Sequence, residues 1–179
     1  DLICSEVNVK ELELLTDTGI LVKSIKPNFK TIGPKYGKQM KSISQVVQQF
    51  DQNDIAQIEQ NEPKAKIILM GDLNDHPQDA APQLIASKLT PQITKASGTF
   101  GGSYNYKNEW EIIDHIFVSN NAFNGTVALQ KESGTIHNFP YLLTEYKGQT
   151  VPNRTYAGPK YLGGYSDHLP VSIKVVLNK

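Results

Sequence analysis

The stretch IILMGDLNDHP, residues 67–77, joins a run of apolar residues to a cluster of acids, amides and a histidine. Ile67 to Met70 have the pattern of a strand buried inside a sheet that is covered on both faces. Asp72 and Asn74 follow directly, where that strand would end. Rigid strands often hold functional side chains in the turns at their ends. A tight turn favours the same residue types, so this stretch alone leaves both interpretations open.

Two later stretches repeat the arrangement. Asp114 adjoins an apolar run in IIDHIF, residues 112–117, and Asp167 and His168 do so in YSDHLP, residues 165–170. Carboxylate oxygens are the ligands that Mg²⁺ or Mn²⁺ prefers, and an acid beside a histidine fixes its tautomer and keeps it charged. Each stretch alone also fits a strand end with satisfied polar groups. The three together, in this order, predict a metal-dependent site built from strand ends.

The composition is that of an ordinary globular protein. The 179 residues, 39% hydrophobic and 20% charged, are enough for one domain with a core or for two small ones. The net charge is zero, so no overall field indicates nucleic acid or a membrane surface as a partner. No stretch approaches the roughly 20 apolar residues of a membrane span. The single cysteine, Cys4, excludes an internal disulfide, and a start at DLICSEVNVK without Met fits a processed or truncated product.

Secondary structure is predicted from hydrophobic periodicity and from the positions of Gly and Pro. We expect two strands and then two helices in the first third of the chain. The remainder is predicted to contain, in order, a buried strand at 65–72, a short helix at 79–89, a strand at 109–121, an irregular loop at 141–165 and a closing strand at 169–177. A loop as long as 141–165 is usually functional in a compact domain.

Residues from about 61 to 179 closely resemble the C-terminal half of the endonuclease/exonuclease/phosphatase family, whose fold is that of deoxyribonuclease I. The matching blocks are IILMGDLND, EWEIIDHIFVS and YSDHLPVSIKV, and the stretches 98–110 and 154–171 look like a secreted bacterial branch. The resemblance implies an α/β fold of the α+β sandwich type, with two sheets in four layers. One sheet of that sandwich is expected here, together with a small N-terminal α/β appendage.

The resemblance also implies roles for the residues at the strand ends. Asp72 would orient and activate the attacking water, and Asn74 would bind the phosphate or the nucleophile. Asp167 would be a ligand of Mg²⁺ or Mn²⁺. His168 would contact the phosphate and Asp114 would pair with His168. The implied reaction is in-line attack on the phosphorus of a phosphodiester or phosphomonoester, the substrate being a nucleic acid, a small molecule or a lipid.

Three further residues are candidates for substrate binding. Arg154 is able to hold a phosphate with two hydrogen bonds, although pinning a loop is an equal alternative. Tyr104 and Trp110 are able to stack on a base or sugar, although aromatic residues near strand ends more often pack in the core or at its rim.

The complete family site needs an N-terminal half that supplies a metal-binding Glu. DLICSEV resembles the family block DIICLQEV, which would make Glu6 that ligand. Residues 1–60, however, resemble the extreme C-terminal region of isoleucyl-tRNA synthetases, above all in KPNFKTIGPKYGKQM, residues 26–40. In that interpretation, which we favour, Glu6 belongs to the appendage and binds no metal.

The chain is therefore predicted to contain two segments, 1–60 and 61–179, joined near QIEQNEPKAK, residues 57–66. A natural fusion, an engineered chimera and an assembly of two genes all remain open, as does the compartment, because one segment resembles secreted proteins and the other a cytoplasmic one. Alternative functions are a tRNA-binding accessory module and a non-functional chimera. We expect residues 1–60 to fold on themselves, residues 61–64 to be exposed, and the incomplete sandwich to self-associate through apolar sheet surface.

Overall fold

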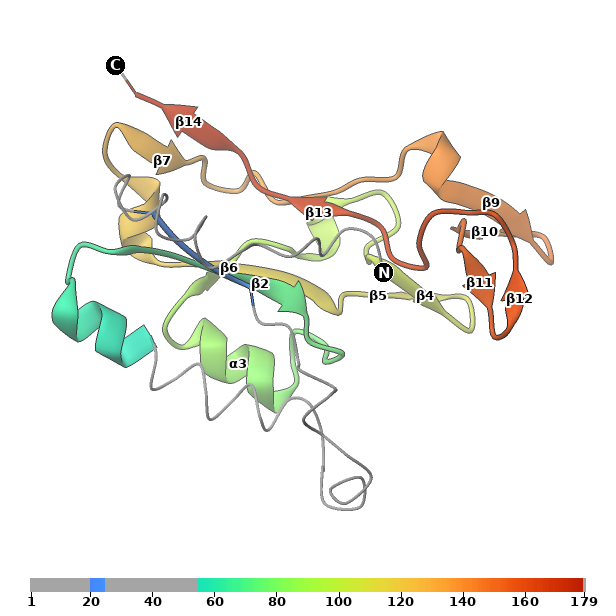
Figure 1. Ribbon diagram of the computed structural model, residues 1–179, viewed down its shortest axis with the longest axis horizontal. Coiled ribbons are helices and arrows are strands. Elements are labelled where there is room, and N and C mark those ends of the chain that lie inside the picture. Colours follow the sequence, from blue (N-terminus) through green and yellow to red (C-terminus); the bar gives the residue numbers. More distant parts are fainter. Residues whose placement is uncertain (1–19, 25–54, 179) are drawn as a thin grey trace.

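The structure is a computed structural model that describes the backbone of residues 20–24 and the whole of residues 55–178. Its central sheet has the strand order β1-β2-β6-β3 (Figure 1). The strands are β1 (Ile20–Ser24), β2 (Lys66–Asp72), β6 (Asp114–Val118) and β3 (Thr90–Pro91). β1 runs parallel to β2, whereas β6 is antiparallel to β2 and to β3.

Strand β2 lies inside this sheet, as its apolar run predicts. Ile67 and Leu69 are buried on one face, and Ile68 packs against the core on the other. Met70 is 40% exposed, so the predicted covering of both faces ends there. The sheet opens to solvent at the position where the polar residues begin.

Helices cover one face of the central sheet. Residues 55–61 are helical, and α3 (Ala80–Ala86) confirms the helix predicted at 79–89. Pro82 lies in the first turn of α3, where a missing backbone N–H removes no helical hydrogen bond. Figure 1 shows α3 beneath β2 and β6. The core cluster on this side consists of Ile55, Ile67, Leu69, Leu73, Ile85, Leu89 and Phe117.

Short strands and turns cover the other face. β7 (Val127–Leu129) pairs with β14 (Val175–Leu177), and β8 (Thr135–Ile136) pairs with β13 (Val171–Ser172). The 3-10 turn η1 (Lys95–Ser97) follows β3 in the sequence. The turn η2 (Asn120–Phe123) follows β6 and precedes β7. Their core cluster consists of Ile93, Ile112, Ile116, Val118, Ala122, Leu129, Ile136, Leu142 and Leu169. Few helices and many short strands make this an α+β fold, as expected.

The prediction that residues 141–165 form an irregular loop is wrong. This segment begins within η3 (Pro140–Leu142) and contains two hairpins. They are β9 (Leu143–Tyr146) with β10 (Gln149–Pro152) and β11 (Tyr156–Ala157) with β12 (Lys160–Tyr161). Lys147 and Gly148 both have positive φ between β9 and β10, which is the geometry of a tight primed hairpin turn.

The predicted strands at 109–121 and 169–177 each divide into two. The first becomes β5 (Glu109–Glu111), which pairs with β4 (Tyr104–Tyr106), and β6. They separate at Ile112 and Ile113, which are consecutive and both buried, so they cannot alternate as in one flat strand. The second becomes β13 and β14, and the predicted alternation shifts after Lys174 because Val176, not Val175, is half-buried.

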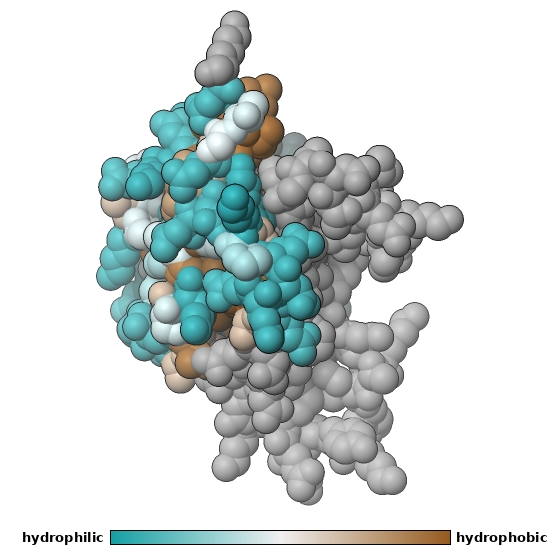
Figure 2. Space-filling view, turned by 90° about the vertical axis from the view of Figure 1, so that its left-hand side faces the viewer, coloured by the Kyte–Doolittle hydropathy of each residue, from teal (hydrophilic) through white to brown (hydrophobic). Residues whose placement is uncertain are grey.

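Surface hydrophobic residues gather at β14. Val175 and Leu177 are 57% and 75% exposed and lie on one face of that strand. Figure 2 shows the side of the molecule that is at the left in Figure 1, with hydrophobic residues near the top, the level at which β14 lies. No helix in the described residues is long and apolar enough to cross a membrane.

The predicted boundary near residues 57–66 is crossed by the central sheet. Residues 61–64 are exposed, as expected. However, β1 belongs to the segment expected to fold on itself, and it pairs with β2 over five residues, from Ile20 with Lys66 to Ser24 with Met70. The expectation that residues 1–60 fold on themselves is therefore wrong at this strand. Glu6 and the other expectations for residues 1–19 and 25–54 lie outside the described residues.

Candidate active site

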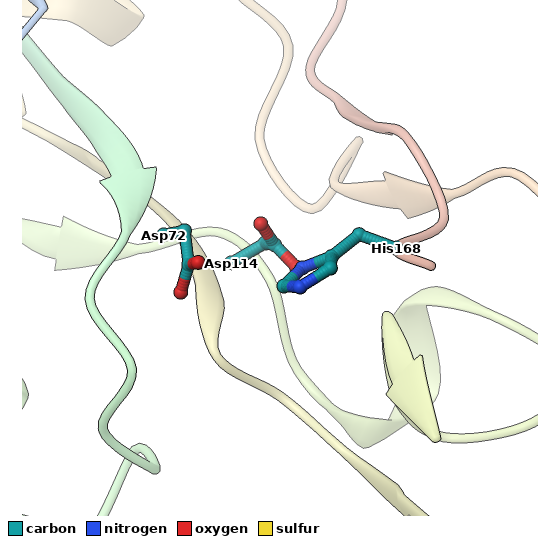
Figure 3. A group of neighbouring side chains, drawn as sticks. All are labelled: Asp72, Asp114 and His168. Carbon is teal, nitrogen blue, oxygen red and sulfur yellow. The ribbon is translucent and has the colours of Figure 1, made fainter. Parts of the chain in front are cut away.

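The ends of two paired strands place two acids side by side. Asp72 ends β2 and Asp114 begins β6, and the two residues are direct partners in the register. His168 comes from the loop before β13 and reaches the same place through a bridge to Tyr104. One ligand atom from each of Asp72, Asp114 and His168 lies within 4.8 Å of the others, and Figure 3 shows Asp114 between the other two side chains. The convergence expected from the three motifs therefore includes these three residues.

Asp114 pairs with His168, as the resemblance implied. The Asp114 Oδ2 atom lies 2.7 Å from His168 Nδ1 and also accepts a 2.6 Å hydrogen bond from the Ser103 hydroxyl. Ser103 is fully buried, and backbone hydrogen bonds to Glu111 and from Leu169 hold it in place. Three residues from three segments thus form a chain of hydrogen bonds, and sequence reasoning missed Ser103. In the sequence Ser103 directly precedes strand β4, and this position alone does not indicate a role in the site.

The same arrangement sets the charge state of His168. Burial lowers the pKa of His168, but the hydrogen bond and charge of Asp114, with the charges of Asp72 and Asp167, outweigh it and raise that pKa above its usual value. Because the Nδ1 hydrogen is directed to Asp114, the Nε2 atom of the ring is the one left to meet a substrate. The arrangement favours a charged donor at the edge of the sheet.

The pKa of Asp72 is raised above that of an ordinary surface acid. Partial burial raises its pKa, and repulsion from Asp114 adds to this, while a hydrogen bond from the Asn74 backbone opposes it. That bond is 2.9 Å long, and the Asn74 side-chain amide lies 3.4 Å from the other Asp72 oxygen. Asn74 has a φ of 50°, a left-handed conformation that Asn tolerates better than most residues. The turn predicted after Met70 therefore also orients a site residue.

Asp167 and Arg154 lie at the rim of the cluster. Their charged groups are 4.0 Å apart and both side chains are well exposed. Asp167 is outside the group of three, although its charge reaches His168. Its role as a metal ligand and that of Arg154 as a phosphate ligand therefore remain predictions.

The two aromatic candidates have different surroundings. The Tyr104 ring lies 4.8 Å from the His168 ring at an angle of 36°, so it borders the site. Trp110 stacks on Phe100 at 4.6 Å and packs against the core cluster. The packing alternative stated for Trp110 therefore has direct support, whereas Tyr104 is placed where it can touch a substrate.

The donor atoms fit an oxygen-bound cation only in part. His168 Nδ1 and the Ser103 hydroxyl both bond to the Oδ2 atom of Asp114, which leaves the Asp72 carboxylate and the Oδ1 atom of Asp114 as possible oxygen ligands. Asp167 offers a further carboxylate, which faces Arg154 at 4.0 Å and lies outside the group of three. Mg²⁺ commonly binds through one or two carboxylates and keeps several waters, so this set fits it or Mn²⁺ without a closed cage.

Comparison with known proteins shows which family the chain belongs to. Residues 30–177 match the endonuclease/exonuclease/phosphatase family. The chain belongs to the endonuclease/exonuclease/phosphatase family. The match extends from before the predicted boundary at residue 60 to the end of β14, so it covers all three motifs.

Three solved structures are similar to the chain. An endonuclease/exonuclease/phosphatase family protein from Bacteroides thetaiotaomicron has a TM-score of 0.45 and 18% identity, covering 73% of this chain and 44% of that one. An endonuclease/exonuclease/phosphatase from Bacteroides vulgatus has a TM-score of 0.45 and 16% identity, covering 75% of this chain and 45% of that one. A conserved protein of unknown function from Enterococcus faecalis V583 gives 0.44, 17%, 75% and 46%. The chain spans less than half the length of each.

Curated relatives match the synthetase-like segment of the chain. Isoleucine–tRNA ligase from Porphyromonas gingivalis is 54% identical over 59 residues, which are 32% of this chain and 5% of the ligase. The Bacteroides fragilis ligase is 49% identical over 61 residues, 34% of this chain and 5% of its own length. Both resemblances inferred from the sequence are thus confirmed, and the chain spans only about a twentieth of these ligases.

Proposed function

We propose that this endonuclease/exonuclease/phosphatase chain takes part in the divalent-metal-dependent hydrolysis of a phosphate ester by in-line attack of water. The observation that supports it most is the Asp114–His168 hydrogen bond of 2.7 Å beside Asp72 at the open edge of the sheet. A charged donor and a separate open carboxylate, held on paired strands, are the groups that this reaction needs.

Each residue has a distinct part in the proposed reaction. His168, kept protonated by Asp114, donates a hydrogen bond from Nε2 to a phosphoryl oxygen and stabilises charge that develops there. Asp72, whose pKa is raised, orients the attacking water and accepts its proton. The Asn74 amide, adjacent to Asp72, binds the phosphate or the water. Asp72 and Asp167 would hold Mg²⁺ or Mn²⁺, which supplies neutralising charge and polarises the phosphoryl group.

Binding of Mn²⁺ tests this site without requiring turnover. Paramagnetic Mn²⁺ titrated into the whole chain is expected to broaden the imidazole NMR signals of His168 at low equivalents. His137, whose ring bonds to Ser172 Oγ at 2.8 Å, serves as the matched control. Asp72→Asn combined with Asp167→Asn should abolish the selective broadening. Equal broadening of both histidines, or broadening that survives in the double variant, would refute the proposed metal site.

Turnover gives a second, independent test. Bis(p-nitrophenyl) phosphate and p-nitrophenyl phosphate distinguish diester from monoester hydrolysis, each with Mg²⁺, with Mn²⁺ and with EDTA. Any hydrolysis by the chain is expected to require the metal and to fall by about 100-fold in His168→Asn, since one oxyanion donor typically contributes 10²–10³. His137→Asn is the control and should keep the wild-type rate. Metal-independent hydrolysis, or hydrolysis unaffected by His168→Asn, would count against the proposal.

A tRNA-binding role is the second candidate, and the 54% identity to an isoleucine–tRNA ligase over 59 residues favours it. Lysines 23, 26, 30, 35, 38 and 41 would supply contacts to phosphates in that segment. A gel-shift assay of the whole chain with isoleucine tRNA and with an unrelated tRNA tests it. Preference for isoleucine tRNA supports the second function, and the absence of both tRNA binding and Mn²⁺ binding would support a non-functional chimera.

A further inference from the structure

Exposed aromatic rings form an array beside the candidate active site. We define it by Phe139, Tyr141 and Tyr165, which are 48%, 57% and 61% exposed. The rings of Phe139 and Tyr141 are nearly parallel, with centroids 5.7 Å apart and an angle of 7°. Tyr165 meets Tyr141 edge-on at 5.5 Å. Three large rings that contact one another and still face solvent are unusual for packing alone and indicate a binding surface.

The backbone holds this array in place. Phe139 and Tyr141 flank the first residue of η3, and the Leu142 N–H donates to the Phe139 carbonyl. The Tyr165 N–H donates to the Asn153 carbonyl at 2.6 Å, and Asn153 in turn donates to Leu142. Both arms of the array are therefore joined through the same short segment. Rings positioned in this way lose little conformational entropy when a ligand stacks on them.

The array adjoins the candidate active site along the chain. Tyr165 precedes Asp167 by two residues and His168 by three. Arg154 follows Asn153 in the chain and lies 4.0 Å from Asp167, so a basic group is present at the rim of the site. Figure 1 shows the hairpins β9–β10 and β11–β12 grouped at one end of the molecule, next to β4 and β5. A ligand whose phosphate meets His168 would have its neighbouring groups beside these rings.

Charge in this part of the chain favours an anionic ligand. The chain as a whole is neutral, but residues 139–165 contain three basic residues and one acidic residue, namely Lys147, Arg154, Lys160 and Glu145. The balance there is 3 − 1 = +2, and it is 3 − 2 = +1 when the range is extended to residue 168 to include Asp167, which faces Arg154. Six of the seven exposed large hydrophobic residues in the same range are aromatic, and only Leu162 is aliphatic. Aromatic faces with basic side chains suit stacked bases and phosphates better than an aliphatic lipid surface.

We propose that Phe139, Tyr141 and Tyr165 stack on the bases of a single-stranded nucleic acid whose phosphodiester lies at His168. This inference rests on the proposed function and names its substrate class. Every base has a flat face, so such an array would bind with little dependence on sequence. Arg154 would contact a phosphate of the same strand, and its weak pairing with Asp167 leaves donors free for this.

Binding without turnover tests the inference. Fluorescence anisotropy of a labelled 10-residue oligothymidylate is measured with the whole chain in EDTA, which prevents metal-dependent cleavage. A labelled abasic oligomer of the same length has the same phosphates and no bases. The oligothymidylate is expected to bind about tenfold or more tightly than the abasic strand, since stacking contributes about 1–3 kcal/mol per base. Equal affinity for the two strands would overturn the proposal.

Variants identify the rings that bind. Tyr141→Ala combined with Tyr165→Ala is expected to weaken oligothymidylate binding by about tenfold or more and to leave abasic binding unchanged. Tyr146→Ala, in the same hairpin region and as exposed as Tyr165, is the control and should bind like wild type. An unchanged double variant, or binding to phosphatidylcholine vesicles or an oligosaccharide in place of DNA, would overturn the proposal. Failure of p-nitrophenyl ester hydrolysis with intact base stacking would instead count against the catalytic proposal alone.

Discussion

Ser103, Asp114 and His168 show how single atoms determine the chemistry of this site. One carboxylate oxygen of Asp114 accepts a hydrogen bond from the buried Ser103 hydroxyl and pairs with the histidine ring. The pairing of Asp114 with His168 could be expected from family-like motifs, because both residues lie within them. Ser103 could not, because its importance comes from its burial and from a contact between residues 11 positions apart, neither of which local sequence encodes.

Removing the Asp114 charge should change the ionisation of His168. In Asp114→Asn the pKa of His168 is expected to fall, because burial then acts without the ion pair that outweighs it. The imidazole NMR signals of His168, titrated in metal-free protein, measure this shift, with His137 as the internal control. Any phosphoesterase activity should fall by about 10–100-fold in the same variant. An unchanged His168 titration would remove Asp114 from its assigned role.

His115 should make the free energy of unfolding depend on pH. Burial lowers its pKa below 6.5, more than its hydrogen bond to the Asp75 carbonyl and the nearby acids raise it. The unfolded chain therefore takes up a proton first as pH falls, and this stabilising contribution, complete above pH 6.5, is lost as pH falls through the lowered pKa.

The comparison of wild type with His115→Gln isolates that contribution. Gln is expected to keep a hydrogen bond to the Asp75 carbonyl but cannot titrate. Urea unfolding at several pH values between 5 and 7 should show a steeper loss of stability in wild type than in the variant. Identical slopes would indicate that His115 is not protonated on unfolding in this range.

At the scale of elements, patterns with many residues were predictable and short ones were not. The apolar run of β2 and the helix α3 could be predicted because each has a sustained periodicity. The hairpins within 141–165 could not, since strands of two to four residues have too few positions to show alternation. The turn between β9 and β10 places Lys147 and Gly148 at positive φ, and a lysine does not predict that conformation.

Contact between elements makes Gly134 a sensitive position. It precedes β8, and a Cβ atom built there would lie 1.8 Å from the Gln92 carbonyl oxygen. Gln92 donates its own N–H to Ile116 in β6, so the clash cannot be relieved without moving β8 from the central sheet. Gly134→Ala is expected to lower the free energy of unfolding by about 1–3 kcal/mol or more.

Thermal unfolding measures the effect of this substitution. Gly71→Ala is the matched control, because a Cβ atom at Gly71 meets nothing within 4 Å. The control should unfold within a few degrees of wild type. A Gly134→Ala protein as stable as the control would show that β8 packs less closely than the structure indicates.

At the scale of the whole molecule, the chain is expected to self-associate and to be at most a weak catalyst. Val175 and Leu177 expose apolar side chains on one face of β14, and adjoining exposed apolar residues often mark a site of association. Phosphoryl transfer needs the cation, the water and the phosphate held together, and in the favoured interpretation of the sequence Glu6 supplies no N-terminal metal ligand.

Sedimentation velocity at several concentrations tests the association. Wild type is expected to form larger species as concentration rises, and Val175→Thr combined with Leu177→Thr should shift the distribution toward the monomer. Glu132→Lys, an exposed change elsewhere on the surface, controls for altered charge. A monodisperse monomer with rapid Mg²⁺-dependent turnover would contradict both expectations.

The pairing of β1 with β2 has a consequence for any shortened form of this chain. Among the described strands of the central sheet β1 is the outermost, and it covers the side of β2 that β6 does not. A fragment that begins at residue 61 would carry β2 as an uncovered edge, with its N–H and C=O groups free to bond to another chain. Removal of the synthetase-like segment would thus leave β2 as an edge strand that can pair with another chain, and the remainder would not be an independent domain. A peptide with the β1 sequence, ILVKS, would be the natural complement of that edge.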